Sequence, residues 1–320
     1  MFKKCWKQLF VCIALLVFAV GCGKEPAKQG APAQNGAKPA LSVGLMPDTD
    51  SVPFIVAREK GFFAEEGVEV TLHPFKSAMD RDAALQSGQI DGAISDLLAA
   101  AFAKAGGFDV RVTSATDGAY QMIAGKGNDA ADVRALAGAD IAVSRNTIIE
   151  YVTDQILAKE NMDGDSINKV IIPQIPTRLE MLQNGKLAAA TLPEPMASIA
   201  VHNGCKFVTG SDELGINPGV SLFTAKAAAD KKAEIQAMYR AYNKAVAYLN
   251  NTDRAEYIDL VIEKGGFPPV AKEALKLPKY HEAALPKESD VVDCIKWLNS
   301  KKLVTETYSY QDIVLDLLSK

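Results

Sequence analysis

The sequence predicts an α/β protein of two lobes, each a mostly parallel sheet flanked by helices, with a helical C-terminal segment. Three observations predict this fold class. Short apolar runs alternate with helical periods, one helix–strand unit occurs twice, and most of the 320 residues follow the N-terminal segment. Strands that alternate with helices of about 10–15 residues are typical of βαβ units. A chain of this length exceeds one typical core, which favours two lobes.

Residues 1–21 are typical of an export signal. Three lysines precede an apolar run of 12 residues, 9–20, and the letters AVGC close it. A membrane-spanning helix needs about 20 apolar residues, so this run is too short to remain in the bilayer. The small residues before Cys22 resemble a bacterial lipobox, which implies cleavage before Cys22 and its diacylation. The alternative is an ordinary secretory signal with an incidental cysteine.

Residues 22–40 are predicted to be a flexible tether. They are rich in Gly, Pro, Ala, Gln and Lys and contain no large apolar residue, so they cannot bury enough surface to fold. Two acyl chains on Cys22 would anchor the protein stably to a membrane. These features predict a lipoprotein on the extracytoplasmic side of the cell membrane, in a periplasm or at the cell surface.

The composition excludes some classes of function. Removal of the signal takes away three lysines and no acids, so the formal charge moves from −4 to −7. An acidic body argues against nucleic acid as a partner. Cys205 and Cys294 and the histidines 73, 202 and 281 match no metal-binding spacing, and a disulfide between the two cysteines stays open. We therefore expect no catalytic residues, no metal and no cofactor.

Ten short runs are predicted to be strands, and helical periods fill most of the gaps between them. The runs are residues 41–46, 68–75, 90–95, 109–116, 120–125, 140–144, 169–173, 187–192, 206–210 and 219–225.

One helix–strand unit occurs twice. Residues 80–94 align with 177–191 at an offset of 97, and residues 43–49 align with 141–147 at an offset of 98. The identical pairs are Arg81/Arg178, Leu85/Leu182, Gln86/Gln183, Gly88/Gly185 and Ala93/Ala190. Two separate segments agree on nearly one offset, which favours duplication over the chance likeness of any two helix–Gly–strand units. We expect residues 41–117 and 222–320 to form one lobe and residues 125–215 the other.

Two stretches carry a resemblance to a known family. The letters PDTDSVPFIVAREKGFFAEEGVEVTL and, after them, SAMDRDAALQSGQIDGAISD resemble the solute-binding proteins of ABC importers. They are most similar to the branch that binds nitrate, sulfonates, taurine and thiamine-pyrimidine precursors. The resemblance implies a type II-like periplasmic-binding-protein fold that closes over one small molecule. It also implies a monomer that delivers this molecule to an ABC permease.

Two other functions stay open at this point. The protein could be a ligand-bound sensor that docks on a membrane receptor. The family also contains enzymes, of a pyrimidine-precursor type and a menaquinone-pathway type, but the Cys-rich motif of the pyrimidine synthase is missing here. After residue 223 the sequence turns helical, and we expect these helices to cover the first lobe.

Polar residues at the predicted strand ends are candidate ligand-binding groups. In open α/β sheets, ligands bind outside the carboxyl ends of the strands. Many of the same residues could instead cap helices. The candidates are Asp48, Thr49, Asp50, Ser51, Ser77, Asp96, Thr116, Asn146, Thr147 and Glu194.

The two acids after the first strand are expected to differ in role. Asp50 is predicted to cap the following helix, which leaves Asp48 to meet the ligand. Acids outnumber bases at the predicted strand ends, where a hydrogen bond to a charged acceptor is worth about 1.5–3 kcal/mol. This balance favours an aminopyrimidine or an amine over a simple anion. The residues counted are Asp48, Asp50, Asp80, Asp96, Asp117 and Glu194 against Arg81 and Arg145.

Overall fold

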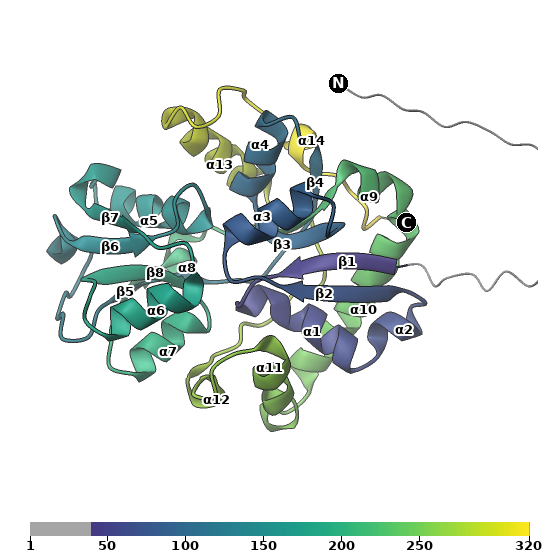
Figure 1. Cartoon of the computed structure of the whole chain (residues 1–320), viewed down its shortest axis with the longest axis horizontal. Helices are drawn as coiled ribbons and strands as arrows, with labels where there is room; N and C mark the ends of the chain where they lie inside the picture. Colours follow the sequence, from purple (N-terminus) through teal and green to yellow (C-terminus); the bar gives the residue numbers. More distant parts are fainter. Residues whose placement is uncertain (1–39, 320) are drawn as a thin grey trace, which may run out of the picture. The chain divides into compact units, whose positions relative to one another are not determined.

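In the part of the chain that the structure describes, ten strands form two five-stranded sheets, each flanked by helices (Figure 1). The computed structural model describes residues 40–319. The predicted export signal, Cys22 and nearly all of the predicted tether lie outside these described residues. The fold class predicted from the sequence is confirmed, and each of the ten predicted runs overlaps a strand.

The sheet of lobe 1 has the strand order β2-β1-β3-β10-β4, and the sheet of lobe 2 has the order β7-β6-β8-β5-β9. Only β10 and β5 run antiparallel to their neighbours. The strands of lobe 1 are β1 (Ala40–Leu45), β2 (Glu69–Pro74), β3 (Gly92–Asp96), β4 (Val110–Ala115) and β10 (Gly219–Thr224). Those of lobe 2 are β5 (Tyr120–Ala124), β6 (Asp140–Val143), β7 (Asn168–Ile171), β8 (Ala189–Pro193) and β9 (Lys206–Gly210).

Helices cover both faces of each sheet, which is why the central strands β3 and β8 are buried along their whole length. The α-helices before residue 220 are α1 (Val52–Glu59), α2 (Phe62–Glu65), α3 (Ala78–Gln86), α4 (Leu97–Ala105), α5 (Ile148–Lys159), α6 (Ile175–Gln183), α7 (Met196–His202) and α8 (Ser211–Leu214). Those after it are α9 (Ala225–Asp230), α10 (Lys232–Asn251), α11 (Ile258–Gly265), α12 (Ala271–Ala274), α13 (Glu288–Ser300) and α14 (Tyr310–Ile313). Short 3-10 helices are η1 (Thr49–Ser51), η2 (Arg134–Leu136), η3 (Gly164–Ser166) and η4 (Arg254–Glu256).

The two lobes repeat one another in detail. Helix α6 begins and ends 97 residues after α3, and β8 begins and ends 97 residues after β3. The strand registers agree as well, since Val43 pairs with Gly92 in lobe 1 and Ile141 pairs with Ala189 in lobe 2. The sequence repeat therefore corresponds to a structural repeat.

The chain crosses between the lobes twice, from β4 to β5 and from β9 to β10. Further contacts join the lobes away from these crossings. The backbone N–H of Thr49 donates to the carbonyl oxygen of Glu194 over 2.9 Å, and that of Ile175 donates to the carbonyl oxygen of Lys76 over 3.1 Å. The side chain of Gln174 donates to Asp80 over 3.0 Å. The lobes thus face each other closely across the cleft.

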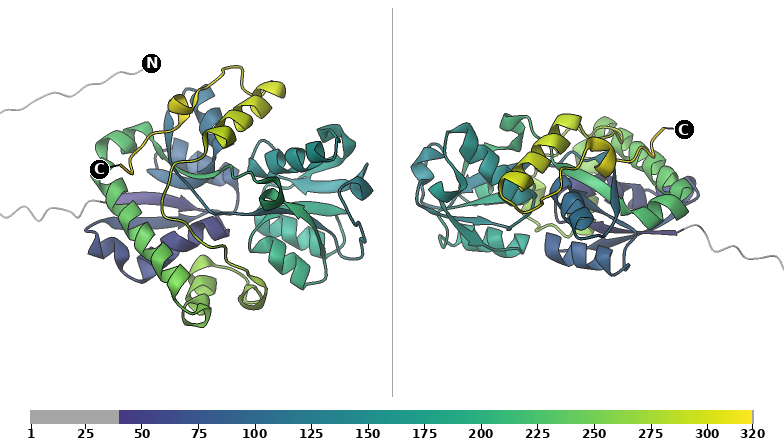
Figure 2. Two further views of the ribbon diagram at one scale, coloured as in Figure 1. Left: turned by 180° about the vertical axis from the view of Figure 1, so that it is seen from behind. Right: turned by 90° about the horizontal axis from the view of Figure 1, so that it is seen from above.

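The C-terminal segment covers the first lobe, as expected from the sequence, and it also packs on the second lobe. Helix α10 packs on α1 and α2 of lobe 1, but α12 packs on α7 of lobe 2. Trp297 of α13 meets the ring of Tyr151 of α5 edge-on and donates to Asp154 over 3.1 Å. Figure 2 shows the extended stretch between α12 and α13 crossing the molecule from one edge to the other. Aromatic packing and a buried hydrogen bond hold α13 against lobe 2. Helical periodicity in the sequence does not predict either of these contacts.

Three smaller findings concern the described residues alone. Cys205 and Cys294 are both buried free thiols, so they are not paired with each other. No helix within residues 40–319 is long and apolar enough to cross a membrane. The same residues contain no cluster of three or more His, Cys, Asp or Glu side chains that could hold a metal ion.

Candidate functional site

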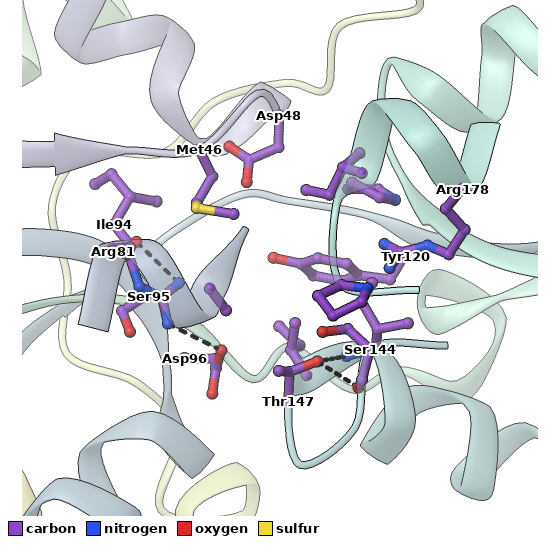
Figure 3. Close-up of a pocket in the computed structure, with 16 residues that line it drawn as sticks. Met46, Asp48, Arg81, Ile94, Ser95, Asp96, Tyr120, Ser144, Thr147 and Arg178 are labelled. Atoms are coloured by element: carbon purple, nitrogen blue, oxygen red, sulfur yellow. Dashed lines mark hydrogen bonds and ion pairs between the residues drawn. The ribbon is translucent and has the colours of Figure 1, made fainter. Parts of the chain in front are cut away.

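A cavity lies between the lobes where the carboxyl ends of strands from both sheets meet (Figure 3). Met46 follows β1, Asp96 ends β3, Ser144 follows β6 and Pro193 ends β8. This is the place that the carboxyl-end rule predicts for a ligand. The residues around it are Met46, Asp48, Ala78, Arg81, Ile94, Ser95, Asp96, Tyr120, Ser144, Thr147, Ile148, Ile149, Pro173, Ile175, Arg178 and Pro193.

The cavity is narrow. Its volume is about 30 Å³, which is room for roughly two water molecules. The first turns of α3, α5 and α6 border it through Ala78, Ile148 and Ile175. Helix N-termini carry partial positive charge and favour negative groups nearby. A ligand larger than a few atoms can enter only when the lobes separate.

Asp48 lines the cavity and also caps a helix. Its side chain accepts from the backbone N–H of Ser51 over 3.3 Å and from the Ser51 hydroxyl over 3.1 Å. Burial, together with the neighbouring Asp50, raises the pKa of Asp48 well above its usual range. The prediction that Asp50 caps the helix is therefore wrong. Asp48 makes the capping bond, because the chain enters the short helix η1 one turn before α1.

Asp50 joins the two lobes and does not cap a helix. Its Oδ2 accepts from the hydroxyl of Tyr120 over 3.0 Å, and both side chains are buried. Burial raises the pKa of Asp50 to about 6, although the hydrogen bond from Tyr120 favours its charged form. Gly118 passes so close that an added Cβ would lie 1.9 Å from Asp50 Oδ2. Asp50 therefore belongs to the junction between the lobes.

Asp96 and Arg81 form a buried charged pair on the lobe 1 side of the cavity. The Arg81 guanidinium lies 3.8 Å from Asp96 and 2.8 Å from Asp82. Asp96 also caps α4 by accepting from the backbone N–H of Ala99 over 2.8 Å. Burial raises the pKa of Asp96, and Arg81 and the Ala99 N–H oppose this rise. The charge of Arg81 is thus compensated from within its own lobe.

Arg178 stands on the opposite side of the cavity, with its guanidinium turned toward the interior (Figure 3). It is 0% exposed, and its Nη1 donates to the carbonyl oxygen of Ile172 over 2.8 Å. Among the described residues, its Nε and Nη2 have no hydrogen-bond partner. A buried donor without a partner costs about 1–3 kcal/mol. Burial also lowers the pKa of Arg178 to about 9.

The other predicted site residues lie outside this cavity, except Thr147. Thr147 caps α5 by accepting from the backbone N–H of Ile149 over 3.2 Å, and its side chain lines the cavity. Ser51 holds the end of β1 by donating to the carbonyl oxygen of Met46 over 2.8 Å. Ser77 caps α3 by accepting from the backbone N–H of Asp80. Thr116 is buried at the first crossing between the lobes, and Asn146 is exposed.

Thr49 and Glu194 line a second, larger cavity of about 600 Å³ behind the junction of the lobes. The carboxylate of Glu194 accepts from the backbone N–H of Ser198 over 3.1 Å and does not line the inter-lobe cavity. Two more of the acids counted from the sequence are bound to other side chains, which reduces the predicted excess of acids around a ligand. Asp80 binds Ser77, and Asp117 binds His281. Of the six counted acids, only Asp48 and Asp96 line the inter-lobe cavity.

Sequence reasoning missed three polar contributors to the cavity, namely Ser95, Ser144 and above all Arg178. Arg81 and Arg178 were visible as an identical pair in the repeat. That pair was the available signal, because a charged residue kept at equivalent buried positions needs a partner or a ligand.

The comparisons with known proteins agree with this fold. A model of the NMT1-like family matches residues 34–262. The chain belongs to the NMT1-like family. Comparison with curated protein sequences gives no match. The family match extends over both crossings between the lobes and ends in α11, so it includes every residue that lines the cavity.

Solved structures share the fold of this NMT1-like protein. The alkanesulfonate-binding protein of Xanthomonas axonopodis pv. citri, bound to MOPS, has a TM-score of 0.74 at 18% identity, covering 88% of this chain and 100% of that one. The zinc-bound ligand-binding component of an ABC-type import system from Staphylococcus aureus has a TM-score of 0.72 at 17% identity. That match covers 88% of this chain and 98% of the other.

The periplasmic nitrate-binding protein of Synechocystis PCC 6803 has a TM-score of 0.64 at 16% identity, covering 78% of this chain and 74% of that one. These likenesses establish the two-lobed fold. Together with the family match, they confirm the resemblance to the solute-binding branch inferred from the sequence.

Proposed function

We propose that this NMT1-like protein is an extracytoplasmic, lipid-anchored solute-binding protein of an ABC importer. It captures a small polar molecule between its lobes and delivers it to a membrane permease. One observation carries the proposal. Buried charged groups from both lobes, Arg81, Asp48 and Asp96 on one side and Arg178 on the other, surround a single cavity at the strand ends. The roles of the structurally similar proteins support the same function.

The ligand carries N–H donors, as an amine or an aminopyrimidine does. Asp48 and Asp96 both face the cavity and present carboxylate oxygens from lobe 1. Hydrogen bonds from a ligand to such acceptors are worth about 1.5–3 kcal/mol each. The protein acts as a monomer whose two lobes close over the ligand. The lipid on Cys22 keeps the protein at the membrane. The protein releases the ligand chemically unchanged.

Mass spectrometry of small molecules carried through purification tests this function. We expect one small polar molecule at near-stoichiometric amount, recovered unchanged after long incubation with the protein. Solution scattering should show compaction when that molecule is added to ligand-free protein. A steady product signal would instead indicate an enzyme. A scattering profile that no small molecule changes would contradict capture between the lobes.

A further inference from the structure

Two arginines occupy equivalent places in the two lobes, but only one has acidic partners. Arg81 is the fourth residue of α3 and Arg178 is the fourth residue of α6, 97 positions later. Arg81 pairs with Asp82 and Asp96. These two carboxylates compensate its charge where it is buried. Nη2 of Arg81 also lacks a well-aligned hydrogen bond among the described residues, but both ion pairs of Arg81 come from its own lobe.

Both acidic partners are missing around Arg178. The positions that correspond to Asp82 and Asp96 are occupied by Leu179 and Pro193, whose side chains accept no hydrogen bond. Among the described residues, Arg178 forms no salt bridge, although its side chain is fully buried. The second lobe therefore has the buried arginine of the repeat without the two carboxylates that pair with it in the first lobe.

The free atoms of Arg178 form one edge of the guanidinium. Nη1 is held by the carbonyl oxygen of Ile172, whereas Nε and Nη2 have no partner. The N–H groups of Nε and Nη2 point in the same direction and are spaced like the two oxygens of a carboxylate. Such fork-to-fork pairs are shorter and stronger than neutral hydrogen bonds. Arg178 lines the cavity, and this edge of its guanidinium is shaped for a planar group with two acceptor oxygens.

We propose that Arg178 binds a carboxylate of the ligand through this edge, and that the ligand is a small amino-acid-like molecule whose N–H donors face Asp48 and Asp96. This inference rests on the proposed function and specifies the ligand class. One molecule then satisfies both sides of the cavity, with an acceptor group toward lobe 2 and donor groups toward lobe 1. The cavity of about 30 Å³ is smaller than any amino acid, so binding requires the lobes to move apart around the ligand.

The electrostatics of the cavity support a ligand with a negative end. With its pKa near 9, Arg178 stays charged at neutral pH. Asp96 is shared with Arg81, and the pKa of Asp48 is raised by its burial beside Asp50. Arg178 has no carboxylate of its own in lobe 2, and the N-terminal turns of α3, α5 and α6 add partial positive charge around the cavity. A ligand carboxylate would pair with Arg178.

Calorimetric titration of the ligand-free full-length protein tests the inference. The probes are glycine and β-alanine, with methylamine and acetate as fragments that carry one group each and taurine as the sulfonate counterpart of β-alanine. We expect at least one of the two amino acids to bind more tightly than either fragment and more tightly than taurine. Arg178→Met should weaken amino-acid binding about ten- to hundredfold and leave methylamine binding unchanged.

Thermal unfolding without ligand separates a binding role from a structural one. Arg178→Met should melt at the wild-type temperature or above it, because two unpartnered buried donors and a buried charge are removed. The matched variant Arg81→Met should melt at a lower temperature, because it leaves Asp96 buried without its partner. Arg178→Lys keeps a charge without the two-pronged edge, so it should bind the amino acid almost as weakly as Arg178→Met.

Two outcomes would overturn the inference, and they are distinguishable. If Arg178→Met binds the amino acids as tightly as wild type, or if taurine or methylamine binds as tightly as they do, the carboxylate assignment fails. Capture of a small molecule would then still stand. If neither these probes nor any co-purified molecule binds the wild type, the proposed function fails and the inference fails with it.

Discussion

Tyr120 of lobe 2 donates its phenolic hydrogen to Asp50 Oδ2 of lobe 1 over 3.0 Å, and both residues are buried. The bond lies beside the first crossing between the lobes, near Gly118. Because burial raises the pKa of Asp50 to about 6, its charge changes within the physiological range of pH. The junction between the lobes is thus sensitive to protonation.

Tyr120→Phe is expected to lower the free energy of unfolding by about 1–3 kcal/mol at pH 7, because a buried carboxylate loses a donor. The loss should be smaller at pH 5, where Asp50 is mostly protonated. Urea unfolding at both pH values measures this. Tyr239→Phe is the control, since Tyr239 bonds only to the neutral hydroxyls of Thr113 and Ser221. Equal losses for Tyr120→Phe at pH 5 and pH 7 would refute the coupling.

Asp50→Asn tests the pH dependence itself. The folded-state pKa of Asp50 is raised from 3.8 to about 6, so the folded protein resists its ionisation. The stabilising contribution of the carboxyl is therefore complete below about pH 4 and is lost as the pH rises through 6. Relative to Asp50→Asn, the wild type should lose on the order of 3 kcal/mol between pH 4 and pH 7. A stability difference that stays constant over this range would disprove the raised pKa.

Gly118→Ala is expected to destabilise the junction of the lobes by about 1–3 kcal/mol, because the new methyl group would overlap the Asp50 carboxylate. Gly106→Ala is the matched control. An added Cβ at Gly106 would meet its nearest heavy atom at 3.3 Å, and the backbone φ there is −78°. Chemical unfolding of both variants measures the difference. Similar stabilities for the two variants would show that the backbone at Gly118 can shift to accommodate a methyl group, which would contradict the prediction.

Asp48→Ala is expected to weaken ligand binding on the order of a hundredfold, because it removes a buried charged partner. It should also lower stability by about 1 kcal/mol, since Asp48 caps η1. Titration with the molecule recovered from purification measures the affinity. Asp253→Ala removes the cap of η4, outside the cavity, and should lower stability without changing affinity. Unchanged affinity in Asp48→Ala would remove this residue from the site.

Cys22→Ser is expected to release the protein from membranes or to block its processing, because the acylated thiol would be lost. Membrane fractionation and incorporation of labelled fatty acid measure this outcome. Cys205→Ser is the control, since that thiol is buried within the folded part of the chain and is not available for acylation. Fatty acid still attached to the Cys22→Ser variant would contradict the anchor.

The fold was predictable from the sequence because its signals are local and occur twice. The apolar runs around Val43 and Ile141 recur with the helices that follow them, and the observed registers keep the same offset. Periodicity and glycine placement are encoded within short windows of sequence, so they need no knowledge of distant contacts. The C-terminal helices were harder to place, because the contact of Trp297 with Asp154 joins residues 143 positions apart.

The candidate site was predictable in position but only partly in composition. The strand-end rule led to Asp48, Asp96 and Thr147, which do line the cavity. It could not show that Glu194 turns toward the backbone of Ser198, since that depends on the path of the chain into α7. Nor could it reveal the unpartnered atoms of Arg178. Missing partners are a property of the packed structure and leave no trace in a short stretch of sequence.

The attachment of the C-terminal segment to both lobes has a mechanical consequence. Two covalent crossings alone would leave the lobes free to swing and to twist about an axis through them. Lys301, the residue after α13, adds a restraint by reaching Glu150 of α5 over 3.2 Å and contacting Asp154 as well. Any movement that separates the end of α13 from α5 must therefore break these two charged contacts together with the bond from Trp297 to Asp154.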